Sequence, residues 1–201
     1  MSKTVTRLFD SYSDATTVVR ELESIGVPHS EISIVANNAH GEHDGVNDDG
    51  DVTRGASTGA ALGGAGGLLA GLGLLAIPGL GPIVAAGWLA ATAAGAAIGA
   101  LGGAATGGIV GALKNAGHTD EEANVYSEGV RRGGTLVSAK VDDDSVAQAE
   151  AIMDRNRSVD AATRGAAYRS AGWDRFDPEA PAYTPDQIER ERNTYAEATR
   201  F

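Results

Sequence analysis

The first forty residues carry a pattern of apolar positions that predicts a strand followed by a helix. Thr4–Phe9 is a run of β-prone residues. After Ser13, a plausible N-cap, five apolar residues fall on one face of a helix: Ala15, Val18, Val19, Leu22 and Ile25. Gly26 follows at the point where a left-handed residue commonly ends a helix, so we expect the helix to stop there.

A second strand is predicted directly after this helix. In Glu31–Ala36, Ile32 and Ile34 would lie on one face of the strand and Val35 on the other. The whole segment has the length of a βαβ unit, which is about thirty residues.

The C-terminal half repeats this order of elements. Thr119 and Glu122 have the spacing of a capping box and predict a helix that runs to about Arg131 and ends at Gly133. Thr135–Val141 then alternates as a strand, with three residues on one face: Val137, Ala139 and Val141.

A second capping box is predicted at Ser145 and Gln148, before a helix with its own apolar stripe of Val146, Ala149, Ile152 and Met153. Val159–Thr163 is a weaker candidate for a fourth strand. Two such halves can pair, so the expected fold class is α+β: a ferredoxin-like βαβ–αβαβ domain.

A long stretch without any charged residue or histidine separates the two halves. It runs from Gly55 to Leu113 and is rich in glycine and alanine. Since soluble domains average about one charged residue in four, this stretch divides the chain into parts. The expected parts are a first half at 1–38, an acidic loop at 39–54, the charge-free segment at 55–113, a second half at 114–167 and a polar tail at 168–201.

Glycines recur every four residues at both ends of the charge-free segment, in two sets that mirror each other about position 83: Gly55, Gly59, Gly63, Gly67 and Gly71, and Gly95, Gly99, Gly103, Gly107 and Gly111. Residues four apart lie on one face of a helix, so each set would form a groove without side chains. The pattern predicts a glycine-zipper hairpin of two antiparallel helices, about 55–77 and 82–113, whose packing interface consists of these ten glycines.

A membrane location would explain why so many helix-interior glycines are tolerated, because the bilayer enforces helical hydrogen bonding. Helices of roughly 34 Å and 48 Å would also match a hydrocarbon core of about 30 Å. The bulkiest apolar residues flank the predicted turn, so this part would insert most deeply. The expected partners are therefore membrane lipid and further copies of the chain, with the α+β domain in the cytoplasm at the inner membrane.

Three alternatives remain open for the charge-free segment and its domain. The same zippers could assemble a soluble homo-oligomeric scaffold. The segment could also be a low-complexity linker. More weakly, the α+β sheet could serve as a small-ligand-sensing module, although no site residues for a ligand are evident.

Three segments of the sequence carry a resemblance to a known family: Thr4–Asn37, Gly71–Ala91 and Glu128–Asp144. Together they resemble the bacterial general stress proteins, described as heat-induced or low-temperature-induced, that contain a glycine-zipper insert. The resemblance covers roughly residues 4–165. It implies a role in the stress response, a connection to the membrane and no known catalysis.

Composition excludes several other classes. A formal net charge of −11 argues against nucleic acid as a partner, because phosphate binding needs a cationic face. The absence of cysteine excludes disulfides, thiolate nucleophiles and Cys-ligated zinc. The charged first thirty residues do not read as a secretory signal, which leaves the cytoplasm as the expected compartment.

Two motifs of enzymes occur in the charge-free segment without the context that they need. Gly55–Gly59 matches the G-x-S-x-G elbow around Ser57, but a turn-like acidic run precedes it instead of a strand. Gly71–Ala76 matches G-x-G-x-x-A, but no acidic residue follows about twenty positions later. We therefore expect a non-enzymatic protein with no catalytic residues and no cofactor.

Acidic and histidine residues crowd the loop His40–Asp51 without the spacing of an EF-hand or of a zinc site. A solvated acidic linker with no metal is the expected state. Arg131 and Arg132 would complement the dipole of the preceding helix. In the polar tail, Thr184–Pro185 predicts the start of a short helix over about 185–196, within a solvated segment that contacts the domain loosely.

Overall fold

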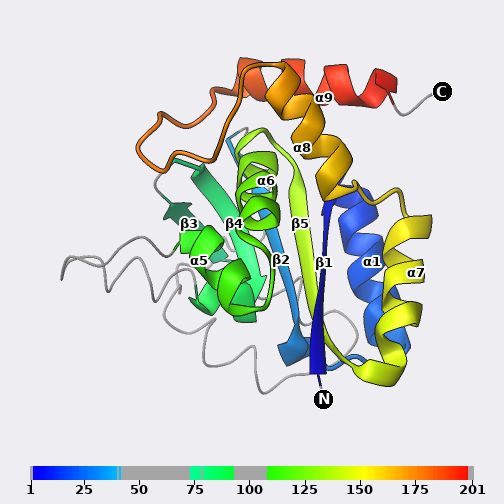
Figure 1. The fold of residues 1–201 in the computed structure, drawn as a ribbon. Coiled ribbons are helices and arrows are strands. Elements are labelled where there is room, and N and C mark those ends of the chain that lie inside the picture. Colours follow the sequence, from blue (N-terminus) through cyan, green and yellow to red (C-terminus); the bar gives the residue numbers. More distant parts are fainter. Residues whose placement is uncertain (1, 40, 42–72, 78, 93–107, 199–201) are drawn as a thin grey trace.

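The structure is a computed structural model that describes residues 2–39, 41, 73–77, 79–92 and 108–198. Its centre is one sheet of antiparallel pairs in the order β1-β5-β2-β4-β3 (Figure 1). The strands are β1 (Ser2–Phe9), β2 (Ile32–Asn37), β3 (Gly73–Ile77), β4 (Gly81–Gly87) and β5 (Thr135–Asp142). The expected α+β class is thus confirmed.

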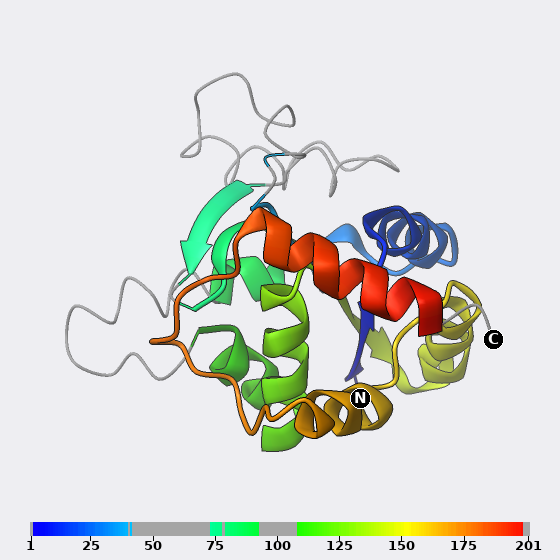
Figure 2. The same ribbon diagram turned by 90° about the horizontal axis from the view of Figure 1, so that it is seen from above.

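Helices cover both faces of the sheet. On one face lie α1 (Tyr12–Ser24) and α7 (Val146–Arg155), and on the other α5 (Gly108–Asn115) and α6 (Asp120–Arg131) (Figure 1). The period of two along each strand divides the core: Ile34 and Val137 pack under α1 and α7, whereas Val35 and Leu136 pack under α5 and α6. The C-terminal helices are α8 (Ala161–Ser170) and α9 (Pro185–Ala198), and α9 crosses over one end of the sheet (Figure 2).

The N-terminal half has the predicted elements. The helix α1 is capped by Ser11 instead of Ser13, because Ser11 is extended and its side chain accepts the N–H of Asp14. Gly26 follows the helix with a φ of 93°. Since β5 pairs with both β1 and β2 in antiparallel fashion, β1 and β2 are parallel and β5 lies between them.

The two predicted capping boxes have different outcomes. At α6, Thr119 accepts from the Glu122 backbone and the Glu122 carboxylate accepts from Thr119, as predicted. At α7, Ser145 is the N-cap but its side chain makes no capping hydrogen bond, so the prediction of a second capping box is wrong. The Ser145 backbone already lies in the helical region (φ −97°, ψ −7°), because it ends a 3₁₀ turn over Asp143–Ser145.

The predicted fourth strand at 159–163 is also wrong. Val159 alone pairs with Leu8, as an isolated bridge. Asp160 then caps α8 by accepting the N–H of Thr163, which starts a helix where the strand was expected. On its other side, the sheet is extended by β4 and β3, which the sequence pattern did not predict as strands.

The predicted helices of the charge-free segment are wrong where the structure describes them around the turn. Residues 73–77 and 81–87 form an antiparallel β-hairpin with Ile77 paired to Gly81, so its centre is position 79 and not 83. The apolar run Ile83–Ala86 pairs with β2 and is buried on both faces, which favours a strand. Within the described part of the segment, helix occurs at 88–92 and in α5.

Gly87 allows β4 to end against the start of β2. Its φ is +86°, and a Cβ at this position would lie 2.1 Å from the carbonyl oxygen of Ile32. Any side chain here would collide with the backbone of β2. The close crossing therefore requires glycine.

The C-terminal segment is packed on the domain and is not a loosely held tail. Tyr168 and Ile188 have no exposed surface, and Phe176 is 9% exposed. The predicted helix after Thr184 is present as α9. Aromatic and aliphatic anchors in an otherwise polar stretch therefore fix its position.

Candidate functional site

The ten glycines of the predicted packing interface lie almost entirely outside the described residues. Gly55, Gly59, Gly63, Gly67, Gly71, Gly95, Gly99, Gly103 and Gly107 belong to that part of the chain. Gly111 is described and is half-buried in α5, whose Ile109, Ala112 and Leu113 are buried in the core. The pairing of the two glycine sets thus stays a prediction.

The outermost strand of the sheet, β3, is the most exposed apolar element among the described residues. Leu74 is 44% exposed, and Ala76, on the same face of the strand, is exposed as well. Ile77 is buried, and Leu75 packs against the core below α5 and α6. The strand contains no charge, no proline and no bulge, which are the usual means of protecting a sheet edge.

Several of the residues that were expected to insert most deeply into a membrane are instead part of this core. Leu80, Ile83 and Leu89 are at most 1% exposed. Among the helices of the described residues, none has both the length and the apolar character needed to cross a bilayer. Lipid contact by the centre of the charge-free segment would therefore require these side chains to leave the core.

The ends of the hairpin define where the rest of the charge-free segment joins the domain. Gly73 pairs with Ala85, so the chain enters β3 and leaves β4 at the same end of the hairpin. The two glycine sets adjoin these two points in the sequence.

A second candidate is a cleft of about 370 Å³ between β1 and the N-termini of α6 and α8. Its lining combines apolar, polar and charged residues: Arg7, Thr119, Glu121, Glu122, Val125, Tyr126, Asp160, Ala161 and Ala162. Arg7 is itself bound to Asp154 at 3.3 Å and lies 3.7 Å from Glu150. The lining thus contains more carboxylates than cationic groups.

Behind this cleft, a chain of polar side chains reaches into the sheet. His118 Nε2 lies 2.7 Å from Thr6 Oγ1, which lies 2.7 Å from Ser138 Oγ. The hydroxyl of Tyr126 donates to the carbonyl of Thr6, and burial raises the pKa of Tyr126 to about 12. These groups satisfy one another, which is the usual condition of buried polar groups.

The pKa values of three ionisable groups at or behind the cleft are lowered, and two of these groups cap helices. Burial lowers the pKa of His118, against the opposing effect of the Glu122 carboxylate. Burial alone would raise the pKa of Glu122, but its hydrogen bonds from Thr119 outweigh this and lower it. The backbone N–H of Thr163 lowers the pKa of Asp160. Both carboxylates are therefore engaged in helix capping.

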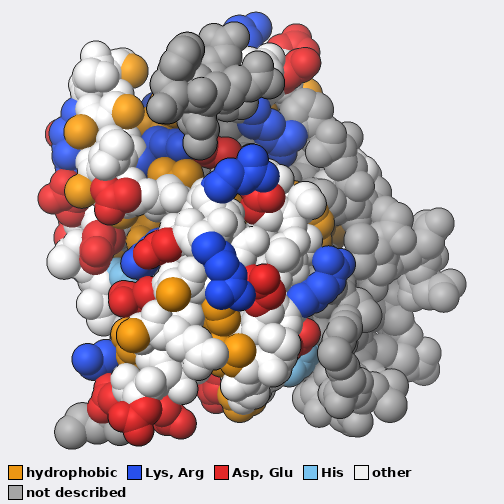
Figure 3. Space-filling view, turned by 90° about the vertical axis from the view of Figure 1, so that its right-hand side faces the viewer, with side chains coloured by type: hydrophobic (Ala, Val, Ile, Leu, Met, Phe, Trp, Pro, Cys, Tyr) orange, Lys and Arg blue, Asp and Glu red, His pale blue; other side chains and the backbone are white. Residues whose placement is uncertain are grey.

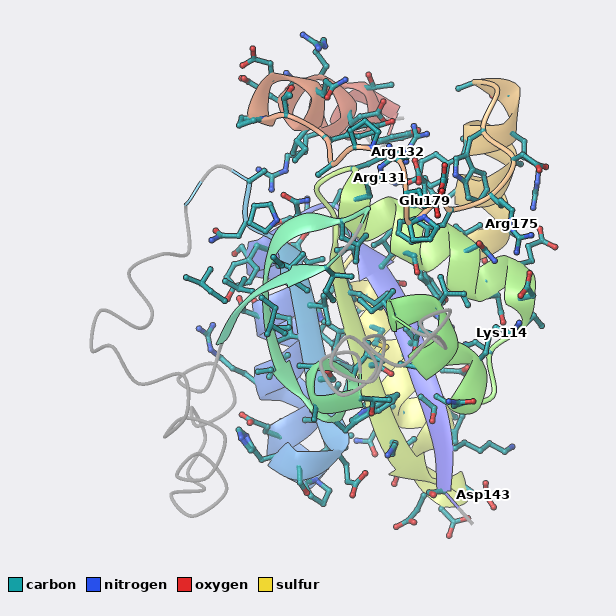
Figure 4. The ribbon with its side chains drawn as sticks, turned by 90° about the vertical axis from the view of Figure 1, so that its left-hand side faces the viewer. Lys114, Arg131, Arg132, Asp143, Arg175 and Glu179 are labelled. Atoms are coloured by element: carbon teal, nitrogen blue, oxygen red, sulfur yellow. The ribbon has the colours of Figure 1, made fainter. Side chains whose placement is uncertain are left out.

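Arginines and tyrosines form a third cluster, at the C-terminal end of α6. The carboxylate of Glu128, which is fully buried, accepts from Arg132 at 2.7 Å and from Arg131 at 3.3 Å. Arg132 lies over the ring of Tyr168, with its guanidinium carbon 4.3 Å from the ring centroid. Figure 4 shows both arginines where α6 ends, beneath α9.

This cluster was not predicted from the sequence. Arg131 and Arg132 were interpreted as complements of the helix dipole, whereas they hold Glu128 and the C-terminal segment. The available signal was the concentration of tyrosines and tryptophan after residue 167, which a purely solvated tail does not need.

The structure describes only some of the other motifs that the sequence analysis considered. Within the described residues, no group of three or more His, Cys, Asp or Glu could hold a metal ion. The acidic loop 42–51 and Ser57 lie outside the described residues. Gly73–Ala76, the end of the G-x-G-x-x-A match, lies within β3 and not in a loop before a helix.

The opposite side of the molecule offers no comparable apolar surface among its described residues. Figure 3 shows acidic and basic side chains intermixed there, with hydrophobic side chains in small scattered patches. Such a mixture is typical of a solvated surface.

Comparisons of the chain with protein-family models, with curated proteins and with solved structures find no significant match.

Proposed function

We propose that this chain is a non-enzymatic stress-response protein that self-associates through its charge-free segment. The observation that carries the proposal is the edge strand β3, which within the described residues pairs with β4 alone and whose Leu74 is 44% exposed. An exposed apolar edge without charge or proline is a template for pairing with another strand. The partner that we propose is β3 of a second copy.

The strand suits antiparallel pairing with itself. With Leu75 at the centre, Gly73 would face Ile77 and Leu74 would face Ala76, so no charge would be opposed or buried. Each cross-strand pair contributes about 0.2–1 kcal/mol, so five pairs supply only a few kcal/mol. A micromolar complex needs about 8 kcal/mol, so a further interface is required.

The two glycine sets are proposed to supply that interface. A helix-interior glycine costs about 1 kcal/mol against alanine, and five such residues per set would be a heavy loss without compensation. Close approach of two backbones offers this compensation through dispersion and Cα–H contacts. The common end of β3 and β4 supports joint action of the edge strand and the glycine sets.

Membrane association is the second candidate, with the α+β domain in the cytoplasm at the inner membrane. The lack of charge between Arg54 and Lys114 favours it. Because Leu80, Ile83 and Leu89 are buried in the core, we propose that lipid contact is made by 55–72 and 93–107. The stress-response role itself rests on the family resemblance.

We also propose a ferredoxin-like origin for part of the fold. The segments β1-α1-β2 and β5-α7 give the order β1-β5-β2, and Val159 pairs with Leu8 on the free side of β1. This arrangement supports a split βαβ unit whose last strand is reduced to one bridge. The hairpin β3–β4 would then be an addition at the opposite edge.

Sedimentation velocity with and without liposomes tests both candidates. The full chain is compared with Gly63→Leu and Gly103→Leu, which place a large side chain on the proposed glycine faces, and with Leu74→Lys. We expect all three variants to shift the chain toward the monomer. A chain that remains monomeric at all concentrations contradicts self-association. A chain that neither floats with liposomes nor needs detergent contradicts the membrane candidate.

A further inference from the structure

The C-terminal segment Trp173–Tyr195, here called the strap, lies across the end of the sheet. It runs from the end of α8, past the turn between β3 and β4, and continues as α9 (Figure 2). The turn that it contacts belongs to the same hairpin that contains the exposed strand β3. The strap therefore contacts the hairpin whose outer strand is the proposed self-association edge.

The strap packs so closely on the domain that there is no room for a side chain at two glycines of the domain, Gly79 and Gly133. A Cβ at Gly79, in the turn, would lie 2.7 Å from Cα of Pro178. A Cβ at Gly133, after α6, would lie 2.3 Å from Cγ2 of Ile188. Since real Cβ contacts are never this short, the strap is seated directly on the backbone of the domain.

Two buried apolar side chains anchor the strap. Ile188 of α9 has no exposed surface, and Phe176 is 9% exposed and belongs to the same core cluster as residues of β4 and α6. Full burial of such a side chain is worth about 1.5–3 kcal/mol. The two anchors lie on either side of the part of the strap that passes the turn.

Polar contacts fix the orientation of the strap between these anchors. Arg131 donates to the carbonyl of Pro181 at 2.9 Å and lies over the ring of Tyr183. Arg132 bonds Glu191 at 3.0 Å, and Arg192 donates to the carbonyl of Gly133. Burial opposes the charge of Arg132, but its pairs with Glu128 and Glu191 outweigh this and raise its pKa. The guanidinium thus stays charged.

The outer strand of the hairpin has less backbone support than the inner one. β4 is held by β2, whereas within the described residues β3 pairs with β4 alone. The strap contacts Gly79 and also Gly81, where a Cβ would lie 2.8 Å from Cβ of Ala182. Loosening of the turn would therefore affect β3 before any other strand.

We infer that the strap is a latch that holds the β3–β4 hairpin in register, so that the edge strand is formed only while the strap is docked. Undocking frays β3 while the rest of the sheet stays intact. The consequence for self-association rests on the function proposed above. The effect on the hairpin itself does not depend on that function.

A reversible crosslink tests the latch in the full chain. The protein contains no cysteine, and a Cβ at Gly133 would lie 3.5 Å from Cβ of Ile188, within the range of disulfides. In the double variant Gly133→Cys, Ile188→Cys, oxidation fixes the strap by a crosslink, and reduction leaves the strap without both the crosslink and its Ile188 anchor. The strain of a side chain at Gly133 is present in both redox states and cancels in the comparison.

Hydrogen exchange provides the readout. On reduction, we expect the amides of Leu74–Ile77 to exchange faster by about tenfold or more, while amides of β1 and α1 keep their rates. Faster exchange in α9 with unchanged exchange in β3 would overturn the latch. General acceleration, including β1 and α1, would also overturn it, because the strap would then support the whole domain.

A second variant avoids engineered cysteines. Phe176→Ala removes one anchor, and Glu179→Ala changes an exposed residue of the same segment as its matched control (Figure 4). We expect faster exchange of β3 in Phe176→Ala only. Sedimentation of the same samples separates the two proposals: faster exchange without any self-association supports the latch and contradicts the proposed function.

Discussion

Arg164 of α8 donates from both terminal nitrogens to the two carboxylate oxygens of Asp10, at 2.8 Å and 2.7 Å, and so joins α8 to the end of β1. The Arg164 side chain is 10% exposed and its guanidinium also lies 4.0 Å from the ring centroid of Tyr195. Bidentate pairs of this kind are stronger and more directional than single hydrogen bonds. The contact therefore helps to hold α8 and α9 on the domain.

Asp10→Asn should lower the free energy of unfolding by about 1–2 kcal/mol, because Arg164 would keep its charge without a counterion. Asp143→Asn is the matched control, since its pair with Lys3 is exposed and 4.0 Å long. The control should change stability by less than about 0.5 kcal/mol. Equal effects of the two substitutions in urea denaturation would show that the Arg164 pair has no special weight.

Glu128→Gln should be more damaging. Glu128 is fully buried and accepts from two arginines, so its neutralisation leaves two guanidinium groups without their common partner. We expect a loss of about 3 kcal/mol in denaturant unfolding. Glu121→Gln, on the exposed side of the same helix, serves as the control. A loss below that of the control would contradict the structural role of the pair.

Acidification should destabilise the protein through His118. Burial lowers its pKa below 6.5, so the folded state binds this proton less readily than the unfolded state. The contribution of neutral His118 is thus complete above about pH 6.5 and is lost as the pH falls through the folded-state pKa. Thermal unfolding between about pH 7 and pH 5 should show a smaller loss in His118→Gln than in the parent. Parallel profiles would exclude this assignment.

The two predicted capping boxes provide an internal test of helix capping. Thr119→Ala removes a side chain that accepts from the backbone of Glu122, and it should cost about 1 kcal/mol. Ser145→Ala removes a side chain that makes no capping hydrogen bond, so it should be close to neutral. Chemical denaturation of both variants measures the difference. A larger loss for Ser145→Ala would mean that the capping geometry of α7 is wrong.

The local sequence pattern was sufficient to predict those elements whose buried face or cap can be recognised from their own residues. The alternation in Glu31–Ala36 and in Thr135–Val141 predicted both strands and the faces on which their residues lie. The capping box of α6 was found for the same reason. The position of β5 between β1 and β2 is consistent with the predicted pairing of two halves.

The hairpin β3–β4 was missed because a stronger pattern covered it. Glycine at every fourth position suggested helices through the whole charge-free segment, while the strand signal of Ile83 and Val84 is only a short apolar run. Such a run is equally compatible with a buried helix. Pairing with β2 decides between them, and that contact lies about fifty residues away in sequence.

The arginine cluster at the end of α6 and the exposed edge strand were predicted least well. The role of Arg131 and Arg132 depends on Tyr183 and Glu191, which reach them only after the strap has crossed the sheet. A pattern within one helix cannot reveal such partners. The exposed edge at Leu74 likewise follows from strand order, which no local signal encodes.

Sedimentation velocity of Leu74→Lys over a wide concentration range tests the central claim most directly. Ala91→Lys adds the same charge at an exposed position of the charge-free segment outside β3 and serves as the control. We predict that the parent and Ala91→Lys associate as concentration rises, whereas Leu74→Lys stays monomeric with an unchanged circular dichroism spectrum. Identical association of Leu74→Lys and the parent, or a parent that is monomeric throughout, would contradict assembly through the edge strand.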